Sequence, residues 1–289
     1  MLGVNFAFWH WQKIDKQILM RTISSLWITY VRLEFDFFGQ HDELRYDEII
    51  NALQNAGIII VWLLSGITPG TIHHLSSRKP IDLVWFEHYI SYMTHRYHLP
   101  YRQIRNEQNT LRFWWSKPNP QDYAKLLIMA RKYIPIWLVC WAVMWNDTSH
   151  LWWIQYGWHL AKTLDIVWDI DILSFHPYSM WCYVWWKNII TTTCNLIDTF
   201  YQNFQHHNKP IRITEFGISR RWTHIDIWSA YREIYKHAST YDMPFFLRNI
   251  CDLYDKYYSR RNPEKYFGLL YPDGTPTQTY DQLYKYIHS

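Results

Sequence analysis

Several polar side chains in this sequence directly follow short apolar runs, where functional groups lie if those runs are strands. Two of them, Glu107 and Glu215, are carboxylates. Carboxyl groups serve as general acids, general bases or nucleophiles, and a pair that flanks one bond is the machinery of glycoside hydrolysis. The other polar residues in equivalent places are Asn5, Arg32, Glu34, Asp36, Asn106, His176 and Tyr178.

The elements before these residues decide whether they can meet. Short β-branched runs alternate with amphipathic stretches along the whole chain, a pattern typical of parallel strands joined by helices. Strands are expected at residues 3–6, 28–35, 58–64, 101–106, 136–143, 170–175, 211–215, 244–250 and 266–270. Helices are expected at residues 12–25, 46–55, 82–97, 120–133, 151–163, 185–204, 225–239 and 279–287. Eight such units in 289 residues predict an α/β fold, a single (β/α)8 TIM barrel over residues 1–289.

A doubly wound open sheet is the alternative architecture. It requires a glycine-rich phosphate-binding loop after the first strand, but residues 7–11 contain no glycine. The barrel is therefore favoured. In a TIM barrel the reactive residues lie at the C-terminal ends of the strands, so Glu107 and Glu215 should face one another across its mouth.

Longer motifs around both glutamates resemble the clan A glycoside hydrolases, most closely families 39 and 5. Residues 105–109 read Arg-Asn-Glu-Gln-Asn and resemble the Asn-Glu-Pro-Asn acid/base motif of that clan. Residues 209–217 contain Thr-Glu-Phe-Gly and resemble its nucleophile motif. Further matches follow in the same order at residues 30–36, 113–114 with 120–124, 174–178 and 266–276.

The resemblance implies a retaining β-glycosidase that acts on a β-linked oligo- or polysaccharide. Glu107 would be the general acid/base and Glu215 the nucleophile, with their carboxyl groups about 5 to 5.5 Å apart. Arg32 would keep the nucleophile charged, and Asn106 would bind the 2-hydroxyl of the sugar. The other residues that the resemblance implies for the sugar subsite are Asp36, Trp114, His176, Tyr178 and Arg248.

Four positions depart from the motifs of that clan. Gln108 replaces a proline that would restrict the backbone of Glu107. Arg105, Arg212 and Arg248 replace large apolar residues, and the aromatic residue matched by Arg248 forms the floor under the bound sugar. These departures leave open a second hypothesis, a non-catalytic or impaired carbohydrate-binding barrel derived from such an enzyme. A barrel hydrolase of other esters or amides is disfavoured, because the sequence lacks Gly-x-Ser-x-Gly.

Composition excludes several other classes of function. With 29 Lys and Arg against 25 Asp and Glu, the net charge of +4 does not predict a nucleic-acid partner. We expect no membrane partner, because every apolar run falls far short of about 20 residues. No signal peptide is recognised, so we expect a soluble protein, either cytoplasmic or secreted with its signal removed. The oligomeric state is left open.

The sequence predicts neither a metal nor a cofactor. Its cysteines are scattered without a metal-binding spacing; they are Cys140, Cys182, Cys194 and Cys251. There are 19 Trp but only 9 Gly in the chain. Trp27, Trp62 and Trp141 fall where such barrels commonly have small residues, so overpacking is expected around these three indoles.

Overall fold

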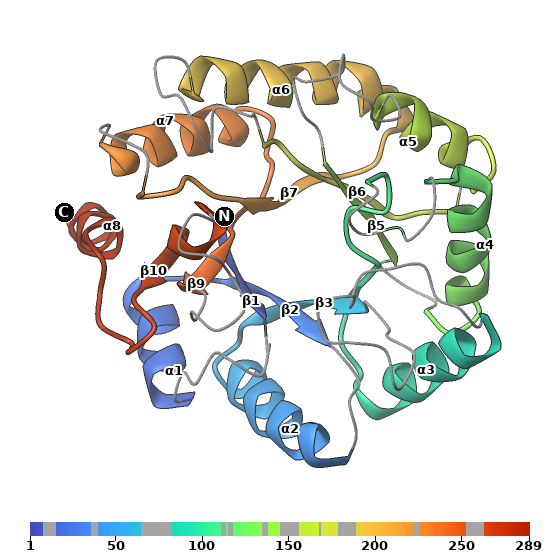
Figure 1. The fold of residues 1–289 in the computed structure, drawn as a ribbon, viewed down its shortest axis with the longest axis horizontal. Coiled ribbons are helices and arrows are strands. Elements are labelled where there is room, and N and C mark those ends of the chain that lie inside the picture. The colour runs from blue at the N-terminus through green and yellow to red at the C-terminus, as the bar shows by residue number, and fades with distance from the viewer. Residues whose placement is uncertain are drawn as a thin grey trace.

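The computed structural model describes residues 1–7, 16–35, 40–64, 83–110, 114, 118–134, 138–144, 156–167, 169–178, 189–221, 226–252 and 263–289. In this part of the chain, eight parallel strands close into a barrel in the order β1 to β8, and β8 pairs with β1. The helices form a ring outside the strands (Figure 1). The predicted (β/α)8 barrel is confirmed, and the open sheet is excluded.

The strands of the barrel are short and run in chain order. They are β1 (Leu2–Ala7), β2 (Tyr30–Phe35), β3 (Ile59–Leu64), β4 (Tyr101–Ile104), β5 (Leu138–Met144), β6 (Ile172–His176), β7 (Ile211–Phe216) and β8 (Phe245–Leu247). Strand β3 is wholly apolar and is buried except for its first residue, as expected of a strand covered on both faces.

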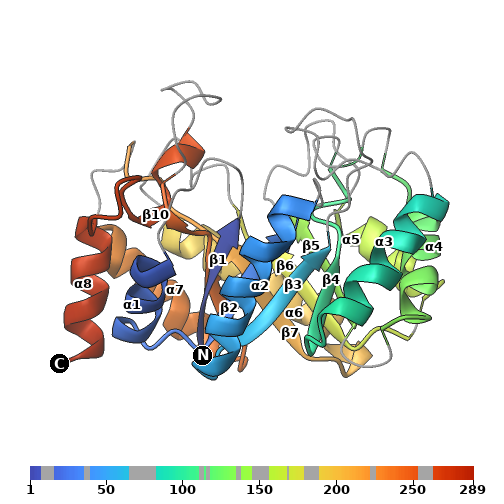
Figure 2. The ribbon, with the colours of Figure 1, turned by 90° about the horizontal axis from the view of Figure 1, so that it is seen from below.

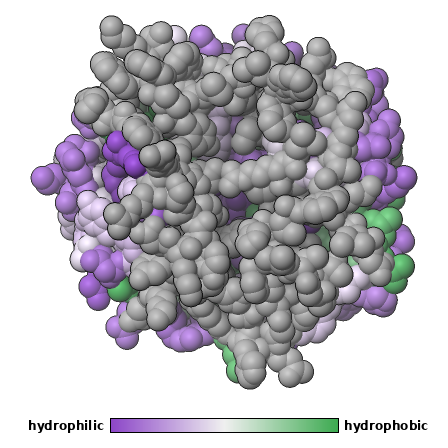
Figure 3. All heavy atoms as spheres, viewed as in Figure 1, coloured by the Kyte–Doolittle hydropathy of each residue, from purple (hydrophilic) through white to green (hydrophobic). Residues whose placement is uncertain are grey.

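The helices follow the strands one by one. They are α1 (Lys16–Ser25), α2 (Gln40–Asn55), α3 (Leu83–Arg96), α4 (Pro120–Arg131), α5 (Tyr156–Leu164), α6 (Ile189–Phe204), α7 (Ile227–Ser239) and α8 (Gln278–Ile287). Helix α8 lies beside α1 (Figure 2), where the hydroxyls of Ser25 and Tyr280 are 2.8 Å apart. None of these helices is long and apolar enough to cross a bilayer, within the residues that the structure describes. On the face seen in Figure 3, the described rim is mainly hydrophilic.

The expected eighth strand, residues 244–250, is divided in the structure. Strand β8 ends at Leu247, and β9 (Asn249–Cys251) leaves the barrel to pair in parallel with β10 (Gly268–Leu270). Asp252 holds this pair together, because its carboxylate accepts from the backbone N–H of Gly268 at 2.8 Å and binds Arg220. Arg248 stands at the junction between β8 and β9, which places it at the C-terminal end of the barrel.

The N-terminal end of the barrel interior is filled by aromatic rings. Phe246 lies over Gly3, where an added Cβ would come within 2.6 Å of the ring, so only glycine fits there. The guanidinium of Arg212 lies 5.5 Å from the ring centre of Tyr30 and 4.3 Å from that of Tyr101. The charge of Arg212 is thus held by cation–π contacts at a position where an apolar side chain was expected.

The overpacking expected at Trp27 is wrong, because its side chain is 63% exposed. Trp27 follows α1 with φ of 48°, and the chain there makes the hydrogen bonds of a Schellman motif, from Trp27 N to Ser24 O and from Ile28 N to Ile23 O. Gly57 ends α2 with the same pattern and φ of 73°. The energetic cost of Trp27 therefore comes from its left-handed backbone conformation and not from crowding of its side chain.

The other two tryptophans differ from Trp27. Trp62 is fully buried and packs edge-on against Tyr97, with ring centres 5.1 Å apart. The core therefore accommodates this indole between the barrel and α3. The side chain of Trp141 lies outside the described part of the structure, so the expectation of overpacking there is not tested.

Replacing Trp27 with glycine should stabilise the protein by about 1 kcal/mol, because glycine adopts the left-handed conformation without a Cβ penalty. Chemical denaturation of Trp27→Gly and Trp27→Ala measures the effect. Alanine removes the same indole but keeps the penalty, so it should give no such gain. Gly57→Ala is the converse control and should lose a similar amount, since open space surrounds its Cβ position. Equal stability of Trp27→Gly and Trp27→Ala would contradict this explanation.

Candidate active site

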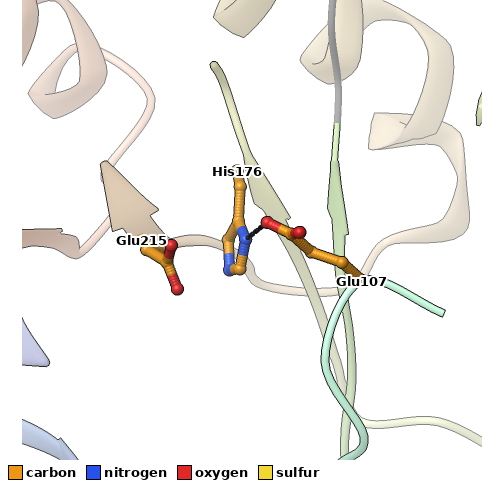
Figure 4. Close-up of side chains that lie close together, drawn as sticks. All are labelled: Glu107, His176 and Glu215. Atoms are coloured by element: carbon orange, nitrogen blue, oxygen red, sulfur yellow. Dashed lines mark hydrogen bonds and ion pairs between the residues drawn. The ribbon is translucent and has the colours of Figure 1, made fainter. Parts of the chain in front are cut away.

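The two predicted carboxylates meet at the C-terminal end of the barrel. Figure 4 shows the ring of His176 between Glu107, which follows β4, and Glu215 near the end of β7. One ligand atom from each of these three buried residues lies within 4.8 Å of those of the other two. Two carboxyl groups this close can contact one substrate bond, whereas a water placed between them would require about 6.5 to 9.5 Å.

The backbone makes a sharp turn between the end of β4 and Glu107. Strand β4 ends at Ile104, two residues before the expected end, because Arg105 and Glu107 adopt left-handed φ values of 67° and 39°. The carbonyl of Glu107 accepts hydrogen bonds from the backbone N–H and the hydroxyl of Thr110, each at 2.9 Å. These bonds close a turn that holds Glu107 in a conformation that non-glycine residues rarely adopt.

Gln108 explains how Glu107 can take this conformation. A proline at position 108 would drive the preceding residue toward extended φ and ψ, away from the φ of 39° that Glu107 adopts. The side chain of Gln108 is 0% exposed, and neither of its amide atoms has a hydrogen-bond partner among the described residues. The departure from the clan motif therefore permits a different turn and also buries an unsatisfied amide.

Glu215 is surrounded by donors. Its Oε1 accepts from the Tyr178 hydroxyl at 3.0 Å and from Arg248 Nη1 at 2.7 Å, and Arg32 Nη1 lies 3.3 Å from Oε2. Burial alone raises the pKa of Glu215. The opposing effects of Arg248, His176 and Arg32, with the Tyr178 hydrogen bond, outweigh it and hold the pKa well below its usual value of 4.5. Glu215 is therefore ionised at neutral pH.

Arg32 is fixed beneath Glu215 by amide oxygens as well as by the ion pair. Its Nε donates to Gln103 at 2.9 Å, Nη1 to Asn5 at 3.0 Å and Nη2 to Asn106 at 2.7 Å. Burial lowers the pKa of Arg32, and the charge of Glu215 is the largest opposing effect. Each of the three guanidinium nitrogens of Arg32 is thus hydrogen-bonded, which orients the side chain toward Glu215.

Two residues of this network were missed in the sequence. Gln103 bonds Arg32, and Thr214 lies with its hydroxyl 3.3 Å from Nε2 of His176. Both are buried polar residues near the C-terminal ends of their strands: Gln103 precedes the last residue of β4, and Thr214 directly precedes Glu215. That position is the signal that could have found them, since buried polar groups require partners.

His176 connects the Thr214 hydroxyl to the acid/base candidate. It is fully buried, and its Nδ1 lies 2.8 Å from Oε1 of Glu107. Either Nδ1 carries the proton and donates to an ionised Glu107, or a protonated Glu107 donates to Nδ1. The position of the Glu107 proton is therefore tied to the tautomer of His176.

The structure brings most of the predicted subsite residues together, with two exceptions. Asn106, His176, Tyr178 and Arg248 are within the network, whereas Asp36 lies outside the described residues. Trp114 is not part of the site: it is fully buried and packs edge-on against Tyr123 of α4 with ring centres 6.2 Å apart. The sequence match around Trp114 thus marked a core position instead of a sugar-stacking surface.

Glu107, His176 and Glu215 have the types and spacing to hold a metal ion. However, the guanidinium groups of Arg32 and Arg248 already contact the Glu215 carboxylate. Two adjacent positive charges oppose a further cation at short range. The arrangement therefore suits acid–base and nucleophilic chemistry by the carboxyl groups themselves.

The sequence matches no protein-family model, and comparison with curated proteins gives no match. Solved structures are similar over the whole chain. A monomeric β-xylosidase from Caulobacter crescentus CB15 has a TM-score of 0.73 at 17% identity, over 100% of this chain and 67% of that one. A family 39 glycoside hydrolase from Bacteroides cellulosilyticus WH2 has a TM-score of 0.61 at 17% identity, over 98% of this chain and 62% of that one. A β-D-glucuronidase from Dictyoglomus thermophilum has a TM-score of 0.65 at 13% identity, over 99% of this chain and 50% of that one.

These similarities show that this chain has the fold of TIM-barrel glycoside hydrolases. The same fold is implied by the motifs in the sequence. The chain spans from half to about two thirds of the length of these three proteins.

Substituting Gln108 with leucine should stabilise the protein by about 1 to 2 kcal/mol, because it removes a buried amide that has no partner among the described residues and keeps a similar volume. Denaturant unfolding measures the gain. The same change at the exposed Gln121 of α4 should be nearly neutral. Gln108→Pro should be destabilising, because proline disfavours the left-handed Glu107, and a stabilised Gln108→Pro would contradict this account of the turn.

Proposed function

We propose that the protein is a retaining glycoside hydrolase that cleaves β-glycosidic bonds by double displacement. The observation that carries this proposal is the buried pair of Glu107 and Glu215, whose facing polar atoms lie within 4.8 Å. The spacing leaves a carboxylate in direct reach of the anomeric carbon and does not accommodate an intervening water. The similarity of the fold to glycoside hydrolases supports the same class of reaction.

In the first step Glu215 would attack the anomeric carbon. Within the described residues, Oε1 of Glu215 accepts two hydrogen bonds, whereas Oε2 has one longer contact, with Arg32, so Oε2 is the oxygen better placed to attack. The bond from the anomeric carbon to the leaving oxygen breaks as Glu107 gives that oxygen its proton. A covalent glycosyl ester on Glu215 results, and Asn106, whose Oδ1 accepts from Arg32, would bind the 2-hydroxyl.

In the second step the roles of Glu107 reverse. Its carboxylate takes a proton from a water molecule, and the water oxygen attacks the anomeric carbon and releases Glu215. His176 supports both steps, because its Nδ1 can donate to Glu107 when that group is ionised and can accept from it when protonated. The chemistry requires no metal or cofactor.

A non-catalytic carbohydrate-binding barrel is the second candidate. The observation in its favour is Arg248, whose Nη1 lies 2.7 Å from Glu215 and lowers the basicity of the proposed nucleophile. A carboxylate with a lower pKa is generally a weaker nucleophile. In this case a β-linked saccharide would bind in the same place without forming a covalent ester.

An activated 2-deoxy-2-fluoro-β-glycoside separates the two candidates. We expect mass spectrometry to find a covalent glycosyl label on Glu215 of the wild-type protein, and we expect Glu215→Gln to lose turnover of aryl β-glycosides by at least about 10⁴-fold. Glu87→Gln, a change at a surface ion pair, should retain both properties. Binding of saccharide without label or turnover would instead establish the non-catalytic reading. Circular dichroism checks that each variant is folded.

The pH dependence of turnover should report the ionisation of Glu215. Because the pKa of Glu215 lies below 4.5, the acidic limb of the wild-type kcat/KM profile should lie below pH 4.5. Tyr178→Phe removes a hydrogen bond that favours the ionised form, so the acidic limb should move to higher pH, with a loss of kcat/KM of about tenfold. Tyr133→Phe, which removes a surface hydroxyl bonded to Glu87, is the control and should leave the limb in place. A limb that moves to lower pH in Tyr178→Phe would contradict this assignment.

A further inference from the structure

Arg248 has a defined position beside the proposed nucleophile. Its backbone N–H donates to the carbonyl of Phe216 at 2.8 Å, at the point where β8 gives way to β9. Its guanidinium lies 5.2 Å from the ring centre of Phe267 and 5.8 Å from that of Tyr178. The side chain is 16% exposed, compared with 5% for Arg32, so it is the more accessible of the two guanidinium groups beside Glu215.

A sugar bound at the proposed nucleophile would lie close to Arg248. Nη1 of Arg248 is 2.7 Å from Oε1 of Glu215 and 3.3 Å from the Tyr178 hydroxyl. The guanidinium is thus within the length of one sugar ring of the anomeric carbon that Glu215 would attack. The hydroxyls of a neutral sugar can accept single hydrogen bonds from the guanidinium, but they offer no opposite charge to offset the cost of removing it from water. A carboxylate can accept two parallel hydrogen bonds from the same guanidinium.

Arg248 is one of two counter-charges of Glu215, and the other, Arg32, would remain if Arg248 moved. Arg32 lies deeper, is 5% exposed and is fixed by three amide oxygens as well as by Glu215. If Arg248 turned toward a substrate, Glu215 would still be paired with Arg32 and bonded to Tyr178. The site therefore holds one guanidinium that orients the nucleophile and a second, more accessible one that can bind a substrate anion.

We propose that Arg248 makes this site selective for a β-linked uronic acid, whose carboxylate it binds beside the nucleophile. The inference rests on the proposed glycosidase function and adds to it the class of the sugar. On binding, the guanidinium moves from Oε1 of Glu215 to the carboxylate of the sugar. Glu215 then loses the group that most reduces its basicity, so the correct substrate activates the nucleophile that attacks it.

Matched substrates that differ only at C6 test this selectivity. The probes are 4-methylumbelliferyl β-D-glucuronide and β-D-glucoside, the corresponding galacturonide and galactoside, and a 6-sulfated glucoside. We expect kcat/KM for a uronide to exceed that for its neutral partner by about tenfold to 100-fold. In Arg248→Leu that ratio should fall by a similar factor. Arg248→Lys, which keeps the charge but loses the paired donors, should give an intermediate ratio.

A direct measurement of ligand binding tests the uronic-acid proposal even if no glycoside is turned over. Calorimetric titration of the wild-type protein with D-glucuronate should show binding that its neutral methyl ester and Arg248→Leu do not show. Turnover of neutral glycosides at equal or higher kcat/KM would overturn the uronic-acid proposal and leave the glycosidase proposal standing. Preference for the sulfated glucoside would overturn it as well.

If no glycoside is turned over, the glycosidase proposal fails, and the titration alone decides whether Arg248 binds a sugar carboxylate. Glucuronate binding that depends on Arg248 would support the binding of a sugar carboxylate by Arg248. Equal affinity for glucuronate and its methyl ester would overturn it.

Discussion

A carboxylate buried at the mouth of a closed barrel must be balanced by positive charge and hydrogen bonds, and the site depends on how this is done for Glu215. Arg32 supplies the charge from the barrel interior. Arg32 in turn needs acceptors for its other nitrogens, and these come from β1, β4 and the turn after β4 through Asn5, Gln103 and Asn106. The polar layer of the barrel is therefore one connected network, since each buried group requires the next.

Glu107 occupies a different environment a short distance away. Within the described residues its carboxylate is paired with the imidazole of His176, which can accept or donate a proton, in contrast to the permanently charged guanidinium groups around Glu215. Two carboxyl groups with such unlike partners can divide the roles of acid and nucleophile. The left-handed turn at Glu107 is part of this arrangement, and it is compatible with Gln108 where a proline would oppose it.

The aromatic surplus of the chain contributes little to the described site. Trp62 and Trp114 are core residues, and Trp27 lies on the surface at a helix end where glycine would be less strained. Tyr178 is the aromatic residue that contacts the nucleophile, and it does so through its hydroxyl. A count of tryptophans is therefore no measure of carbohydrate binding, because an indole is a large apolar group that cores also accept.

The alternation of apolar runs and amphipathic stretches was enough to predict the barrel, because hydrophobic periodicity is local and each β/α unit carries its own signal. The motifs at residues 105–109 and 209–217 likewise located Glu107 and Glu215, since the strand order of a barrel brings strand ends together. Tertiary structure alone decided that Arg248 contacts Glu215 and that Gln103 and Thr214 join the network. It also decided that Trp114 is buried and that the eighth strand divides at Arg248. These features depend on distances between residues far apart in the chain, which local pattern does not encode.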